Sequence, residues 1–155
     1  MSTIVLKFGG TSVATVDLIK SAAEIVKKEY DAGNNLAVVV SAMAGTTNSL
    51  IDYVKEINIS SDSEYDVVVS SGEQITSGLM SMALEELGIP ARSWLGWQLP
   101  ILTSGPHRNS VIEKISPDKI IDGFKEKKVA VLAGFQGLSV NDRITTIGRG
   151  GSDNT

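Results

Sequence analysis

The stretch "IVLKFGGTSVA", residues 4–14, places a lysine in an apolar run and follows it with two adjacent glycines. The β-branched residues predict a short buried strand over residues 3–8. Phosphate binding would explain Lys7, Gly9 and Gly10 together, because glycine loops let backbone N–H groups approach an anion. The alternatives are a tight turn at the glycines and an edge-strand lysine with its ammonium group in water.

Composition sets the broad class of the protein. The chain has 155 residues, enough for one compact domain, and 42% of them are hydrophobic. The net charge of −4 argues against a nucleic-acid partner, which needs a clustered basic face. Without cysteine, the chain has no disulfide or thiolate metal site, and we identify no metal ligands. The apolar runs are too short to span a bilayer and no leader pattern begins the chain, so we expect a cytoplasmic protein without membrane partners.

The first half of the chain alternates between strand and helix patterns. A helix is predicted over residues 15–32, where one apolar face carries Ile19, Ala22, Ala23, Val26 and Tyr30. The run "LAVVVS", residues 36–41, predicts a strand that is buried on both faces. A second helix is expected over residues 48–57, with Thr47 or Asn48 as its N-cap.

The second half continues this alternation, with one ambiguous segment. Val67 to Val69 favour a strand, although the residues that follow do not, and a helix is predicted over residues 74–87. Residues 92–98, 110–115 and 128–135 resemble strands, and Ser116 and Pro117 predict a helix start between the last two. Strands that alternate with helices indicate a layered α/β domain with a mostly parallel sheet. In such sheets, ligands bind beyond the carboxyl ends of the strands.

Four segments carry most of the functional signal. They are "KFGGTSV" (7–13), "VVVSAMAGTTN" (38–48), "SSGEQ" (70–74) and "TTIGRGGSD" (145–153). The P-loop pattern G-x-x-x-x-G-K-[ST] is absent, so a different phosphate site is required. In order and spacing, the four segments resemble the motifs of aspartate kinases in the amino-acid-kinase family. The resemblance runs from Ile4 to the last residue.

This resemblance implies a fold and a reaction. The fold is a three-layer αβα sandwich with a mainly parallel central sheet, which we expect to be incomplete at its C-terminus. Residues 1–155 would be the N-terminal, amino-acid-binding part of the catalytic domain, without the nucleotide-binding half and the regulatory ACT domains. The whole enzyme would transfer the γ-phosphoryl group of ATP, with Mg²⁺, to the side-chain carboxylate of L-aspartate. This is the first step of lysine, threonine and methionine biosynthesis, and we expect the isolated chain to be inactive.

The resemblance also assigns residues to the two ends of the reaction. Lys7 matches the catalytic lysine that stabilises charge on the transferred phosphoryl group. Asp153 matches the catalytic aspartate that orients this lysine and the groups around the reacting phosphate. The phosphate-facing loop would consist of Gly9, Gly10, Thr11 and Ser12. Substrate-binding positions are matched by Ser41, Thr47, Glu73, Arg149 and Ser152, with Glu73 pairing with the substrate ammonium and Arg149 with a carboxylate. The family pattern further implies a homo-oligomer, commonly a dimer.

Three interpretations stay open at this stage. The chain is either part of an active kinase, or a truncated amino-acid-binding remnant, or a sister kinase with another acidic substrate. A free α-amino acid needs both an anion and a cation in its site, so Glu73 with Arg149 favours the aspartate kinase. His107, the only histidine, is interpreted as a solvated loop residue near the substrate rim with Arg108. No general base is needed, because the attacking carboxylate is already ionised at neutral pH.

Overall fold

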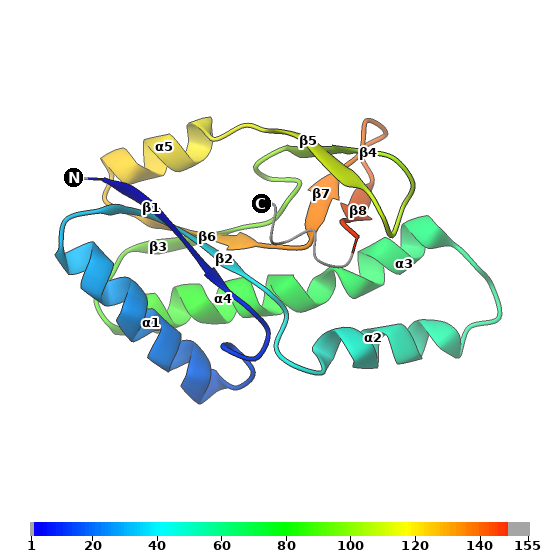
Figure 1. Cartoon of the computed structure of the whole chain (residues 1–155), viewed down its shortest axis with the longest axis horizontal. Coiled ribbons are helices and arrows are strands. Elements are labelled where there is room, and N and C mark those ends of the chain that lie inside the picture. The colour runs from blue at the N-terminus through cyan, green and yellow to red at the C-terminus, as the bar shows by residue number, and fades with distance from the viewer. Residues whose placement is uncertain (1, 149–155) are drawn as a thin grey trace.

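A four-stranded parallel sheet forms the centre of the computed structural model, which describes residues 2–148 (Figure 1). Its strands are β1 (Thr3–Phe8), β2 (Asn35–Val40), β6 (Val129–Ala133) and β3 (Ala91–Trp94), in the order β1-β2-β6-β3. Lys7 lies opposite Val39 in the register of β1 and β2. Because the strands are parallel, their carboxyl ends, including the end of β1 that carries Lys7, meet at one edge of the sheet.

Helices cover both faces of this sheet. On one face, α1 (Val16–Asp31) and α4 (Ser71–Glu86) pack against β2, and the core there includes Val26, Val38 and Leu84. On the other face, α5 (Asp118–Lys125) packs through Ile120 against a smaller cluster that contains Trp94. The predicted apolar face of α1 is the buried face of that helix. The predicted three-layer αβα sandwich with a parallel central sheet is therefore confirmed.

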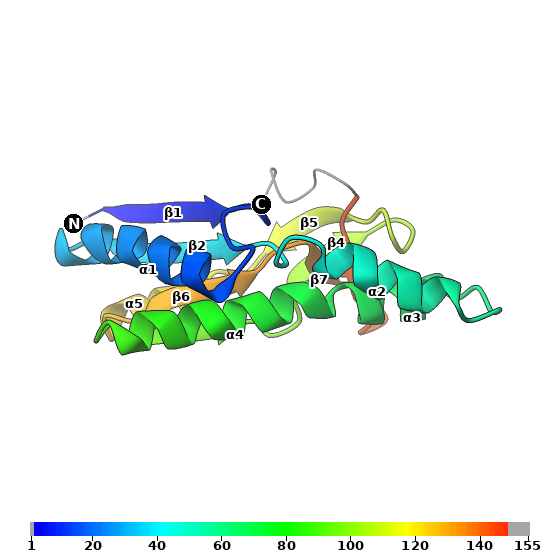
Figure 2. The same cartoon turned by 90° about the horizontal axis from the view of Figure 1, so that it is seen from below.

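A second, mixed sheet was not anticipated from the sequence. It contains β5 (Val111–Ile115), β4 (Ile101–Ser104), β7 (Gln136–Leu138) and β8 (Ile144–Thr146), in the order β5-β4-β7-β8. Figures 1 and 2 show it at the end of the molecule toward which β1 and β2 run, where α3 (Asp62–Val69) contacts β8. Helix α2 (Thr46–Lys55) precedes α3 in the chain. Buried hydroxyls join its strands, since Thr103 Oγ1 and Thr145 Oγ1 lie 2.6 Å apart.

Helices α3 and α4 follow one another almost without interruption, with Ser70 at the joint (Figure 1). The strand favoured for Val67 to Val69 is therefore wrong, and α4 begins at Ser71 rather than at Gln74. Tertiary packing explains the difference, because Val69 is fully buried and burial outweighs the weak helix propensity of valine. The Gln136 side chain donates a hydrogen bond to the Ser70 carbonyl, at 3.0 Å, and fixes the joint.

Smaller differences concern where elements begin and end. Helix α2 begins at Thr46 after Gly45, so Thr47 lies in the first turn and is not an N-cap. Pro117, rather than Ser116, is the N-cap residue of α5. The strand predicted over residues 92–98 is confined to Ala91–Trp94. Across residues 2–148, the helices are too short or too polar to cross a membrane.

Candidate functional site

The glycine pair after β1 forms a turn that touches the loop after β2. The Ser12 N–H donates to the Gly9 carbonyl, and the Ser41 N–H donates to the Phe8 carbonyl. A Cβ atom added to Gly10 would lie 2.9 Å from the Ala42 carbonyl oxygen, closer than side chains tolerate. A Cβ on Gly9, by contrast, would meet no other atom within 4 Å. Gly10 is thus required by packing, whereas Gly9 faces open space.

The start of α4 packs against the same loop. A Cβ on Gly72 would lie only 2.8 Å from the Ala42 Cβ atom, so this close approach depends on glycine. The contact brings Glu73, in the first turn of α4, to the backbone of Ala42. Glu73 Oε1 accepts a hydrogen bond from the Ala42 N–H at 3.1 Å. The motifs "SAMAG" and "SSGEQ" therefore meet in space, although about thirty residues separate them.

Glu73 is buried with half of its carboxylate unsatisfied. The residue is only 3% exposed. Among the buried side-chain nitrogen and oxygen atoms of residues 2–148, Glu73 Oε2 is the one without a hydrogen-bond partner. Burial raises the pKa of Glu73 to about 7, because a charged carboxylate loses its hydration there. A buried, unpaired carboxylate oxygen of this kind is suited to binding a cation or an ammonium group.

Glu73 opens into a pocket of about 380 Å³ beyond the carboxyl edge of the central sheet. Ser41, from the loop after β2, and Thr47, from α2, contribute hydroxyl groups to its lining. Phe135, from the loop before β7, and Thr146, from β8, form another part of the wall. The second sheet thus contributes directly to the site.

One face of the α3–α4 segment forms a wall of this pocket. Tyr65, Val69 and Glu73 all line it, and their four-residue spacing places them on one helical face. Arg108 also lines the pocket, and its guanidinium lies over the Tyr65 ring at 4.2 Å. The described lining therefore combines one carboxylate, one guanidinium and several hydroxyls, a combination suited to a small zwitterionic ligand.

The predicted site residues fall into three groups. Ser41, Thr47 and Glu73 are brought together in the pocket. Lys7 and residues 9–12 lie at the end of β1, beside the loop that carries Ser41 but outside the residues that line the pocket. Lys7 is exposed, on a strand that forms the edge of the described sheet. The third group, Arg149, Ser152 and Asp153, lies outside the described residues.

Sequence reasoning missed Tyr65 and the way Arg108 is held. It also placed His107 in solvent, whereas His107 Nδ1 lies 2.6 Å from Asp66 Oδ2 and only 25% of the His107 side chain is exposed. Asp66 itself is fully buried. A signal for α3 was present, because Ser61 and Glu64 have the S-x-x-E spacing typical of a helix start. With α3 recognised, the spacing of Tyr65, Val69 and Glu73 would have placed all three on one face.

A larger cavity, of about 700 Å³, lies between α5 and strands β1 and β2. Its lining is mostly apolar, with Val5, Val39 and Ile121 among the residues, and Val5 is 61% exposed. It lies on the α5 face of the central sheet, opposite the face that α1 and α4 cover, and offers few polar groups. The smaller pocket, with convergent polar groups and a perturbed carboxylate, is the stronger candidate for binding a polar ligand.

Comparisons with known proteins identify the family of the chain. The profile of the family described as "Amino acid kinase family" matches residues 2–155. An aspartokinase from Rickettsia felis is 48% identical over 159 aligned residues, which cover 100% of this chain and 40% of the relative. An aspartate kinase from Pseudomonas putida is 50% identical over 156 residues, covering 100% of this chain and 38% of the relative. The chain thus spans about 40% of the length of the curated relatives it matches.

Solved structures show the same fold. The crystal structure of aspartate kinase from Synechocystis superposes with a TM-score of 0.78 at 38% identity, covering 96% of this chain and 24% of that one. The structure of aspartokinase III from E. coli in complex with aspartate and ADP gives a TM-score of 0.81 at 25% identity, covering 99% of this chain and 45% of that one.

Proposed function

The chain belongs to the amino acid kinase family, and from this membership we propose that it is the amino-acid-binding part of an aspartate kinase. The proposed reaction transfers the γ-phosphoryl group of MgATP to the side-chain carboxylate of L-aspartate. The products are 4-phospho-L-aspartate and ADP. In this proposal, residues 1–155 correspond to the N-terminal part of the catalytic domain of the longer relatives. A cytoplasmic location and a homo-oligomeric state remain predictions.

The observation that carries the proposal is the unpaired Oε2 atom of Glu73. Its buried position beside a pocket lined by hydroxyls is what an α-ammonium group needs. The identity of about half of all aligned residues to proteins named aspartokinase supports aspartate over other acidic substrates. Ser41 and Thr47 supply further hydrogen-bonding groups for the same ligand.

The phosphoryl-transfer end of the reaction is assigned to the end of β1. Lys7 would stabilise negative charge on the transferred group, and the backbone of residues 9–12 would face the phosphates. Open space beside Gly9 supports this assignment. An oxygen of the aspartate side chain attacks the γ-phosphorus, the bond to the ADP oxygen breaks, and no covalent enzyme intermediate forms. Arg149, Ser152 and Asp153 are proposed to complete the site from the C-terminal motif.

Mg²⁺ would enter this reaction with the nucleotide and would neutralise charge on its phosphates. We therefore assign it to the ATP phosphates. The described residues contribute Lys7 and the glycine turn at that end of the site.

Calorimetric titration of the chain with L-aspartate and with succinate tests the proposal. Succinate has both carboxylates of aspartate but no ammonium group, so the parent chain should bind L-aspartate in preference. Glu73→Gln should remove most of this preference, because the unpaired carboxylate oxygen is replaced. Equal binding of the two ligands by the parent chain, or no binding of either, would overturn the proposal.

A further inference from the structure

Asp66 is a fully buried carboxylate that the proposed reaction does not use. Both of its oxygens accept the Arg108 backbone N–H, at 3.1 and 3.2 Å. Oδ1 also accepts the Thr146 hydroxyl at 2.6 Å, and Oδ2 lies 2.6 Å from His107 Nδ1. A buried carboxylate is unfavourable unless its oxygens are satisfied, and these groups satisfy them.

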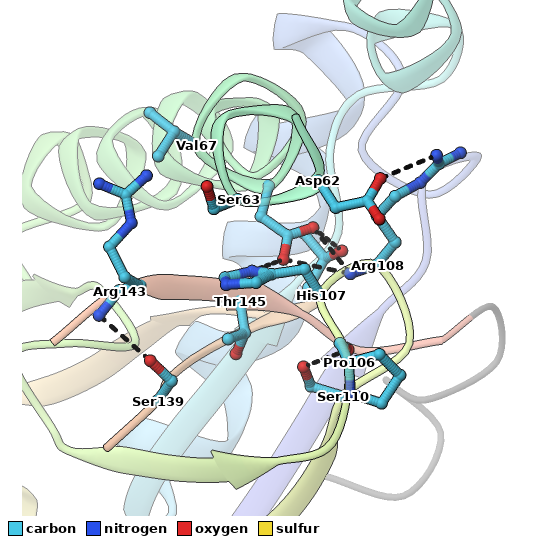
Figure 3. Close-up of polar contacts among 12 residues, drawn as sticks. Asp62, Ser63, Val67, Pro106, His107, Arg108, Ser110, Ser139, Arg143 and Thr145 are labelled. Carbon is cyan, nitrogen blue, oxygen red and sulfur yellow. Dashed lines mark hydrogen bonds and ion pairs between the residues drawn. The ribbon is translucent and has the colours of Figure 1, made fainter. Parts of the chain in front are cut away.

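These partners all lie in segments that border the pocket. Arg108 and Thr146 line the pocket themselves, and His107 precedes Arg108 in the loop between β4 and β5. Figure 3 shows His107 and Arg108 on this loop, facing the α3 helix. Asp66 therefore joins α3, the β4–β5 loop and β8 at one point. Its contacts fix the pocket wall without reaching the pocket.

The Arg108 backbone is held in an uncommon conformation. Its φ angle is 66°, in the left-handed region that non-glycine residues rarely adopt. Such a conformation is unfavourable and persists where surrounding contacts enforce it, often at functional sites. Here the enforcing contact is the pair of hydrogen bonds from the Arg108 N–H to Asp66. The strain points to a function for the side chain that this backbone directs.

The Arg108 side chain is held at the pocket by exchangeable contacts. Nη1 lies 3.2 Å from Asp62 Oδ1 (Figure 3). The guanidinium also stacks over the Tyr65 ring. About half of each charged side chain in the Arg108–Asp62 pair is exposed. Exposed ion pairs contribute little free energy, so a ligand carboxylate could replace Asp62 at small cost. The stacking on Tyr65 would keep the guanidinium in place during that exchange.

We propose that Arg108 binds a carboxylate of the amino acid in this pocket, and that Asp66 is the positioning residue that holds Arg108 there. The inference rests on the proposed function and deepens it by assigning a second cation to the substrate. Glu73 and Arg108 give the described lining one charge of each sign, as a zwitterion requires. Aspartate has two carboxylates, so Arg108 and the proposed Arg149 would not compete for the same group.

The test is calorimetric titration of the chain with three ligands. They are L-aspartate, L-asparagine, which lacks the charged side-chain carboxylate, and L-aspartic acid α-amide, which lacks the charged α-carboxylate. Arg108→Gln should weaken L-aspartate binding roughly 10- to 100-fold, the size expected for losing a charged hydrogen bond. It should also abolish the preference for L-aspartate over one of the two amides, which identifies the carboxylate that Arg108 binds.

Arg143→Gln is the matched control. Arg143 also pairs with a carboxylate of α3, that of Glu64, but it is not among the residues that line the pocket. Figure 3 shows it at the other end of this contact region from Arg108. Binding of all three ligands by this variant should stay within about twofold of the parent chain, since surface ion pairs contribute little.

Asp66→Asn separates positioning from general stabilisation. If Asp66 acts through Arg108, its substitution should weaken L-aspartate binding in the parent chain and add nothing in the Arg108→Gln background. A further loss in that background would overturn the positioning assignment. If Asp66→Asn does not fold, the Arg108 variants alone decide the carboxylate assignment. His107→Ala then replaces Asp66→Asn in the cycle, because it removes an Asp66 partner that is not among the residues lining the pocket.

The outcomes distinguish this inference from the proposed function. A parent chain that binds L-aspartate, with Arg108→Gln binding all three ligands as the parent does, would overturn the inference alone. A parent chain that does not bind L-aspartate would overturn the proposed function and the inference together.

Discussion

Glu73 accepts a hydrogen bond from the Ala42 backbone N–H through Oε1, at 3.1 Å, while its Oε2 atom has no partner. The single bond fixes the orientation of the carboxylate and leaves its second oxygen available in the pocket. Desolvation is the larger effect, because the pKa of Glu73 is raised to about 7 despite this bond. The folded chain thus keeps an unfavourable group at the pocket, and this has consequences for both stability and binding.

Glu73→Gln should stabilise the chain above neutral pH. The pKa is about 7 in the folded chain and 4.5 for the unperturbed group, so between these values the folded state binds more protons than the unfolded state. Stability therefore falls as pH rises from about 4.5 to about 7, by roughly 3 kcal/mol. Glutamine is neutral throughout and avoids this loss. Urea unfolding should show the variant more stable than the parent at pH 8 and similar to it near pH 4.5.

The control for this measurement is Glu85→Gln, which changes an exposed glutamate of the same helix. Its stability should follow that of the parent at every pH. A Glu73→Gln variant less stable than the parent at pH 8 would contradict the assigned effect of burial.

L-Aspartate binding should strengthen as pH rises through 7. The ligand ammonium pairs with the ionised form of Glu73, and protonation near pH 7 removes that form. One pH unit below the pKa, about nine-tenths of the group is protonated, so affinity should be roughly tenfold weaker at pH 6 than at pH 8. Calorimetric titration at pH 6, 7 and 8 measures this. The Glu73→Gln variant should lack the dependence, and a parent chain with flat affinity would argue against an ammonium site at Glu73.

The two adjacent glycines should respond differently to alanine. Gly10→Ala places a Cβ atom 2.9 Å from the Ala42 carbonyl oxygen, so the turn must move and the free energy of unfolding should fall by about 1–3 kcal/mol. Gly9→Ala meets nothing within 4 Å and should leave stability unchanged within about 0.5 kcal/mol. Urea unfolding of both variants provides an internal comparison. Equal losses at the two positions would show that packing against Ala42 is not what requires Gly10.

Lys7→Ala should separate binding from turnover. Lys7 lies outside the pocket lining, so the variant chain should bind L-aspartate within about twofold of the parent. In a form of the protein that makes aspartyl phosphate, kcat should fall on the order of 100-fold or more, as for the loss of one group that stabilises transition-state charge. A hydroxamate assay measures the acyl phosphate. A Lys7→Ala variant that loses aspartate affinity but keeps kcat would contradict the assignment of Lys7 to phosphoryl transfer.

Much of the central sheet could be predicted from the sequence, because its inner strands β2 and β6 are apolar on both faces. The run "LAVVV" has no other stable place than a covered parallel sheet, and the face around Ile19 and Val26 determines α1. Of the second sheet only β5 was predicted, as the strand over residues 110–115, because β4, β7 and β8 are short and several of their buried residues are polar. Thr103, Thr145 and Gln136 are buried through hydrogen bonds, which hydrophobic periodicity does not detect.

The site residues that belong to sequence motifs could be predicted. Those that depend on contacts between distant parts of the chain could not. Ser41, Thr47 and Glu73 follow from the resemblance, and the structure brings them into one pocket. Arg108 and Asp66 are forty-two residues apart and belong to no motif, so only the folded chain reveals their pairing. Lys7 at the phosphate end stays a prediction from the motif.

The near-continuous α3–α4 segment fixes the length of one wall of the pocket. Tyr65 and Glu73 are eight residues apart, about 12 Å along a helix axis, and the Gln136 amide holds the joint at Ser70 between them. A helix resists shortening far more than a loop does, so the separation between Tyr65 and Glu73 stays constant. Aspartate and glutamate differ by one methylene group, a difference worth about 1–3 kcal/mol in a pocket of fixed length. A preference for aspartate over glutamate would then originate in the fixed separation of two residues on one helical segment, rather than in any single contact with the ligand.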